Sequence, residues 1–243
     1  DFVESEYIAL EDPPGSFPDG FIGNRFYFRS VEVPFDTTSQ VFIVPREMAI
    51  TIDPRGPAPT AVESVVNGLR VLEFTMHESR PVVPEPGSVS GREFLPSINI
   101  AANATWESFV DGMRDVLADR DVRDPSAVRL VRTILRGSEN AGPEAKARKL
   151  YEWVLANVES SEAFFGSAPA MLAAKTGNRV RVLRYVFGLA GIPSDLVAVR
   201  SKAADITESP VADAATYASD VLRVQLPSGE PWISGGERWM TFG

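Results

Sequence analysis

The sequence predicts an α+β protein in which an N-terminal antiparallel β-sandwich portion is followed by a domain of helices and an antiparallel sheet. In residues 1–100, short runs of β-branched and aromatic residues alternate with Pro, Gly and Asp clusters. From about residue 104 the apolar residues recur with the helical period of 3.6, and after residue 193 strand patterns return. We therefore predict two domains, residues 1–100 and residues 101–243.

The composition excludes several kinds of chemistry. The 243 residues include no Cys and a single His, His77, so thiol nucleophiles, disulfides and cysteine metal sites are excluded. The formal net charge of −9 argues against a general binder of nucleic acid or anionic membranes, because such proteins need a positive field. No apolar run approaches the ~18 residues of a transmembrane helix. We expect no nucleic-acid partner, no membrane span in this segment and no cofactor.

The N-terminal strands are predicted from β-branched and aromatic residues that lie between turn-forming clusters. The clearest candidates are Phe26–Val33, Val41–Val44 and Leu69–Met76. The stretch Pro81–Gly87 contains three prolines, each of which removes a backbone donor, so it cannot form a central strand.

The second half is predicted to contain five helices, each with a capping residue, a proline or a closing glycine at one end. They start after Thr105 or Asn103, after Asp124, at Pro143, near residue 168 and after Asn178. The first carries an apolar face that begins with Trp106 and Phe109, and the fifth ends at Gly191-Ile192-Pro193. The strands expected after it are Leu196–Val199, Val221–Leu226 and Pro231–Ser234.

The order of helices and strands predicts that a functional site lies at the start of the fifth helix. The first turn of a helix presents unpaired N–H groups and the positive end of the macrodipole. In a thiol enzyme a Cys stands at such a position, because a thiolate is stabilised there and its pKa falls. The strands that face the helix would supply a base and the group that orients it.

Five segments, taken in order and with their spacing, resemble a bacterial transglutaminase-like protein with a papain-like core. They are Phe94–Ile100, Thr105–Glu107, Tyr151–Val158, the helix from Gly177 to Pro193, and Gly236–Gly243. The resemblance covers about residues 20–243, and the β-rich part resembles the uncharacterised N-terminal domains that precede this core in secreted or periplasmic bacterial proteins. Active relatives use a Cys-His-Asp triad for acyl transfer. The resemblance implies an extracytoplasmic location, in the periplasm or cell envelope.

The triad of the active relatives is missing from this chain. The family's Gly-Asp-Cys matches Gly177-Asn178-Arg179, so Arg179 stands at the nucleophile position. Asp220 stands at the His position and Ser234 at the Asp position. Realignment cannot restore the thiol, because the chain contains no Cys. We therefore expect a degenerate, non-catalytic transglutaminase-like module with a binding or assembly role and a protein or peptide partner.

Residues 171–202 form a basic stretch, with six basic residues and one acidic residue in an otherwise acidic chain. One interpretation is a solvated helix face. A second is an ion pair between Arg179 and Asp220 across the former cleft, where the cation would otherwise oppose the helix dipole. A third is an anion-binding or peptide-binding domain, in which Arg179, Arg181 and Arg184 hold an external carboxylate or phosphate.

The four tryptophans are divided between core and candidate binding positions. Trp106 and Trp153 lie on apolar helix faces and are expected in the core. Trp232 and Trp239 are less constrained, and Trp232 is a candidate residue for lining a peptide or glycan groove.

An enzyme with displaced chemistry, a peptide or amide hydrolase or an acyl transferase, is the alternative from another class. Ser234 near Asp220 would supply a nucleophile and a base, but an ordinary Asp has a pKa of about 3.9, far below that of a base poised near neutral pH. A calcium site from Asp205, Glu208, Asp213 and Asp220 lacks the spaced loop motif, so no metal is expected. A purely structural domain would show a flat apolar patch instead of a pocket.

Overall fold

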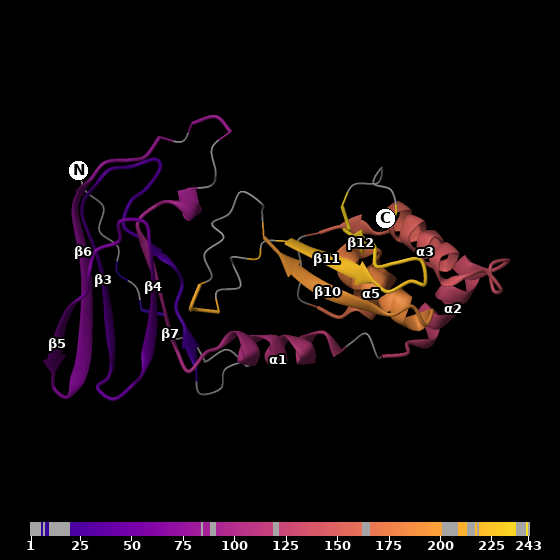
Figure 1. Cartoon of the computed structure of the whole chain (residues 1–243), viewed down its shortest axis with the longest axis horizontal. Helices are drawn as coiled ribbons and strands as arrows, with labels where there is room; N and C mark the ends of the chain where they lie inside the picture. Colours follow the sequence, from indigo (N-terminus) through magenta and orange to yellow (C-terminus); the bar gives the residue numbers. More distant parts are fainter. Residues whose placement is uncertain are drawn as a thin grey trace. The chain divides into compact units, whose positions relative to one another are not determined.

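The chain forms two compact units, which are described separately (Figure 1). The computed structural model describes residues 6, 8–9, 20–83, 85–87, 91–118, 122–161, 166–200, 209–212, 217, 219–236 and 242. Unit 1 comprises residues 1–113 and 202–213, and unit 2 comprises residues 114–201 and 214–243. The division therefore falls inside helix α1 (Trp106–Val116), whereas the sequence places it between residues 100 and 101.

Unit 1 is a sandwich of two antiparallel sheets. In one sheet β7 pairs with β1, β2 and β4, and in the other the order is β3-β6-β5. Ile98 of β7 and Leu72 and Phe74 of β6 share one buried cluster, so the core lies between the sheets. The strands are β1 (Phe21–Ile22), β2 (Phe26–Tyr27), β3 (Phe35–Pro45), β4 (Ile50–Arg55), β5 (Val62–Val66), β6 (Leu69–Ser79) and β7 (Ser97–Ala102), with a 3₁₀ turn at Gly91–Glu93.

The structure shortens the strand predicted over Phe26–Val33 and adds strands that were not predicted, among them β1, β4, β5 and β7. The strand expected over Phe26–Val33 ends at Tyr27. The Phe28 N–H still donates to the Pro96 carbonyl at 2.9 Å, but Pro96 has no N–H to return, so the ladder stops there. Strand β5, which the sequence analysis did not predict, is joined to β6 by the two-residue turn Asn67-Gly68.

A buried carboxylate explains why two distant segments belong to unit 1. Asp53 on β4 is buried, forms an ion pair with Arg25 and lies 3.6 Å from the Arg55 guanidinium. The Ser209 hydroxyl donates to the same carboxylate at 2.7 Å, and the Trp106 indole donates to the Ser209 carbonyl at 3.1 Å. The start of α1 and the segment 209–212 are thereby fixed to the sandwich.

Unit 2 surrounds one central helix, α5, which contacts α2, α3, α4, β10 and β11. The core residues of α5, such as Leu183 and Phe187, are completely buried. The antiparallel sheet has the order β10-β11-β12, and a short parallel pair joins β8 to β9. The elements are α2 (Pro125–Leu135), α3 (Pro143–Asn157), β8 (Glu159–Ser160), α4 (Ala168–Ala174), β9 (Thr176–Gly177), α5 (Arg179–Leu189), β10 (Ser194–Val199), β11 (Ser219–Val224) and β12 (Trp232–Ile233).

Side-chain capping bonds mark the predicted starts of α1, α2 and α5, whereas α3 and α4 begin with a proline in the first turn and no side-chain cap. The Thr105 hydroxyl accepts from the Ser108 N–H at 3.2 Å, and the Asp124 carboxylate accepts from the first turn of α2. The Asn178 side chain accepts from the Arg181 N–H at 2.9 Å. The predicted apolar face of α1 is only partly covered, because Val110 is exposed. Within the part of the chain that the structure describes, no helix is long and apolar enough to cross a membrane.

Candidate functional site

The first turn of α5 places the guanidinium of Arg179 where the resemblance predicts a nucleophile. Arg179 is the first residue of the helix and is only 7% exposed. Its Nε donates to the Val158 carbonyl at 2.8 Å. Its Nη1 donates to the carbonyls of Gly236, at 2.6 Å, and Gly235, at 3.3 Å. One side chain thus connects the start of α5, the end of α3 and the segment after β12.

A second helix end compensates the unfavourable position of the Arg179 charge. A cation at the start of α5 faces the positive end of that helix dipole. Val158, however, is the residue that ends α3, where the dipole is negative, and the last turn of α3 contains no basic residue of its own. The Arg179 guanidinium supplies the missing cation, so its compensating partner among the described residues is the end of α3 and not an acidic side chain.

Gly235 allows the segment after β12 to approach α5 closely. A Cβ atom at Gly235 would lie 2.7 Å from the Arg179 Cβ and 3.0 Å from the Val180 backbone nitrogen. The first distance is shorter than Cβ contacts in real proteins and the second is unusually tight, so a side chain at this position would force a shift. The carbonyls of Val158, Gly235 and Gly236 were not among the predicted partners of Arg179, although the Gly235-Gly236 pair is a visible sequence signal.

Asp220 lies near the same helix start but does not pair with Arg179. The half-buried Asp220 on β11 accepts a hydrogen bond from the Asn178 amide at 3.3 Å. Its Oδ2 is buried without a hydrogen-bond partner among the described residues. Burial raises the pKa of Asp220, which the hydrogen bond from Asn178 and the charge of Arg181 partly oppose. The predicted Arg179–Asp220 ion pair is wrong, because backbone carbonyls occupy the guanidinium.

The other predicted arginines do not form a solvated face. Arg181 is 2% exposed. The half-buried Arg184 donates to the Leu117 carbonyl at 2.8 Å through Nη1. An external anion would therefore reach Arg179 or Arg181 only after the covering segments had moved.

The structure places Ser234 and Trp232 on either side of the buried Ile233. Trp232 is 55% exposed and stands opposite Arg223 in the β11–β12 register. Arg223 forms an ion pair with Asp195 at 2.8 Å. Ser234 is half-buried and directly precedes Gly235. Because Arg179 is buried and Trp232 points to solvent, the structure does not bring these two side chains into one groove.

The remaining candidate residues from the sequence do not form a site in the described part of the chain. Asp205, Glu208, Asp213 and Trp239 lie outside the described residues. Among the residues that are described, no three His, Asp or Glu side chains are grouped so that they could hold a metal ion. His77 is exposed on β6 and lies 3.2 Å from the Thr37 hydroxyl.

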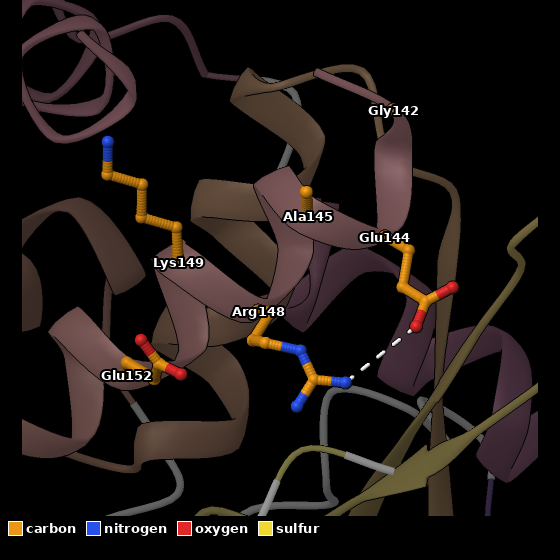
Figure 2. A pocket seen from close by; sticks show the side chains of 6 residues that line it. All are labelled: Gly142, Glu144, Ala145, Arg148, Lys149 and Glu152. Carbon is orange, nitrogen blue, oxygen red and sulfur yellow. Dashed lines mark ion pairs between the residues drawn. The ribbon is translucent and has the colours of Figure 1, made fainter. Parts of the chain in front are cut away.

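A surface hollow lies at the beginning of α3, whereas Arg179 contacts the end of that helix. Figure 2 shows the six residues that line it: Gly142, Glu144, Ala145, Arg148, Lys149 and Glu152. Arg148 and Glu144 form an ion pair one helical turn apart, at 3.7 Å. Among the described residues, those that line the hollow come from one helix and the residue before it. Two of them contact other segments, because the Ser228 hydroxyl donates to Glu144 at 2.8 Å and Arg148 lies over the Phe242 ring.

Comparison with known proteins identifies a fold and no family. No family model matches the chain, and no curated protein matches it. A crystal structure of a "putative protease" from Parabacteroides distasonis superimposes with a TM-score of 0.71 at 15% sequence identity. The match covers 92% of this chain and 44% of that protein, so the chain spans less than half the length of the protein it matches. The chain has a transglutaminase-like α+β fold. The predicted fold class is confirmed.

Replacing Asp220 by Asn is expected to stabilise the protein at neutral pH. When folding raises the pKa of a carboxyl, the folded state becomes less stable as the pH rises above the carboxyl's unfolded pKa of 3.8. Asp220→Asn removes this loss, so its melting temperature should exceed that of the wild type at pH 7, and the gain should vanish below pH 3.8. Asp36→Asn, at an exposed position of β3, is the control for the change in charge. A variant less stable than the wild type at pH 7 would contradict this assignment.

Replacing Arg179 by Ala is expected to lower the free energy of unfolding by at least about 3 kcal/mol, because three hydrogen bonds are lost and bonds to a charged group are worth roughly 1.5–3 kcal/mol each. Urea denaturation measures the change. The matched control is Arg46→Ala, whose side chain is 67% exposed, with an expected effect within about 0.5 kcal/mol. Equal stability of the two variants would show that the Arg179 bonds contribute nothing.

Proposed function

We propose that this protein is a non-catalytic transglutaminase-like module with a binding or assembly role, acting on a protein or peptide partner in the bacterial cell envelope. The observation that carries the proposal is the use of Arg179. At the position where active relatives place a thiolate, the side chain is buried and bonded to three backbone carbonyls. A residue held in this way supports the fold and is not available as a nucleophile.

The packing around Arg179 supports the same proposal. Gly235 lies against the first turn of α5, so the space above the helix start is filled by the segment after β12. Binding of substrate carbonyls by the N–H groups of this turn would require that segment to move. The envelope location rests on the resemblance of the sequence to secreted and periplasmic proteins.

One observation favours the alternative of an enzyme with displaced chemistry. Burial raises the pKa of Asp220, which moves this carboxyl toward the range of a general base. Ser234, two residues after Trp232, would be the nucleophile. The only side-chain bond of the Asp220 carboxylate among the described residues is to the Asn178 amide, so this base is not oriented toward a hydroxyl.

An assay for amide chemistry separates the two functions. The protein is incubated with a mixed peptide pool and a primary amine, and mass spectrometry detects cleavage and amine incorporation. We expect neither product above the level given by a Ser234→Ala, Asp220→Asn double variant. Products formed by the wild type and lost in the double variant, with the melting temperature preserved, would overturn the proposal and establish displaced chemistry.

A further inference from the structure

Strand β5 leaves one edge of the β3-β6-β5 sheet unpaired. β5 pairs with β6 on one side, and no described strand pairs with its other side. All five of its residues, Val62 to Val66, are exposed. Natural edge strands are usually protected by Lys, Pro or a bulge, but this strand contains only Val, Ser and one Glu. No strand among the described residues blocks this edge, so it can accept another strand.

The turn between β5 and β6 determines which backbone groups point outward. Asn67 and Gly68 have φ values of +51° and +80°, as a two-residue type I′ hairpin turn requires. The flanking residues Val66 and Leu69 therefore form a hydrogen-bonded pair, and such pairs alternate along the ladder. The backbone N–H and C=O groups of Val62 and Ser64 likewise point to β6. The N–H and C=O groups of Glu63 and Val65 consequently point to the free edge.

We propose that β5 pairs antiparallel with β5 of a second copy of this chain, with Ser64 on the two-fold axis. In this register Glu63 of each copy lies opposite Val65 of the other, and both residues have outward-pointing backbone groups. The pairing forms two hydrogen-bonded pairs and a six-stranded sheet across the two copies. Val62 then lies beside the second copy's Val66, which covers two side chains that are 69% and 52% exposed in one copy.

The charges in β5 select this register over its neighbours. A shift by one pair in one direction would place Glu63 opposite the second copy's Glu63, a like-charge contact that destabilises a sheet. A shift in the other direction would place Glu63 opposite Asn67, which lies in the turn. In the proposed register Glu63 faces Val65, and its charge is balanced within its own chain by Arg70, 3.6 Å away.

Exposed apolar residues on the outer face of the sheet also favour a second copy of the chain as the partner of β5. Val41 and Ile43 on β3 and Leu69 on β6 are exposed in the same sheet as β5. Pairing through β5 would extend this apolar face continuously across both copies. Pairing two five-residue strands buries less than the ~1,200 Å² of surface that a stable interface buries. The association is therefore reversible and must be trapped to be measured.

A cysteine scan of the 243-residue chain tests the register, because the wild type contains no Cys. Ser64→Cys places two thiols in directly opposed positions with Cα atoms about 4.5 Å apart, within the range for a disulfide. Under mild oxidation we expect this variant to form a covalent dimer. Val62→Cys is the matched control, because its two thiols would be offset by four residues, about 13 Å along the strand.

Two further variants make the outcome decisive. A mixture of Val62→Cys and Val66→Cys chains should form a covalent heterodimer, since these positions are opposite in the proposed register. Adding Val65→Pro to Ser64→Cys should abolish the dimer without unfolding the sheet, because it removes only an outward N–H. The proposal is overturned if Ser64→Cys cross-links no faster than Val62→Cys, or if Val65→Pro leaves the cross-linking unchanged while circular dichroism shows an intact fold. Either result would leave the edge as a site for an extended peptide instead.

Discussion

A buried cation, the Arg179 guanidinium, lies at the start of the central helix of unit 2 and joins the segments around it. Three backbone carbonyls from two other segments accept its hydrogen bonds, and the end of α3 supplies the negative dipole that the start of α5 does not. A buried carbonyl that loses its donor costs free energy. The bonds to Arg179 therefore hold the end of α3 and the segment after β12 against the start of α5. The close approach at Gly235 completes the contact.

In this protein the fold does not by itself indicate a chemical activity. A transglutaminase-like scaffold does not determine activity, because activity depends on the groups at the site. Here the helix start carries an arginine directed at the protein's own backbone. The neighbouring Asp220 is held by Asn178 in surroundings that favour its protonated form. The Arg179 guanidinium therefore stabilises the protein's interior, whereas the half-buried Asp220 carboxylate costs stability at neutral pH. The proposed interaction role would use other surfaces, such as the edge of β5 that pairs with no described strand.

Local rules predicted much of the fold, whereas long-range contacts decided the site. The starts of α2 and α5 follow from the caps Asp124 and Asn178, and that of α3 from Pro143, all of which involve neighbours within four residues. Strand β5 was missed although Asn67-Gly68 is a strong hairpin signal. The partners of Arg179 lie 21 to 57 residues away and are backbone atoms, which carry no sequence signature. Charge counting therefore suggested Asp220 as the partner of a residue whose true partners are carbonyls.

Proton exchange at the Arg179 Nε measures the central claim most directly. Nuclear magnetic resonance resolves arginine Nε–H groups, and an Arg179→Lys variant assigns the signal. Arg46, whose side chain is 67% exposed, is the internal reference for free exchange with water. A guanidinium bonded to the Val158 carbonyl should exchange far more slowly than that of Arg46, and only when the protein opens. An Arg179 Nε–H that exchanges as fast as that of Arg46 would show an accessible side chain and contradict the account.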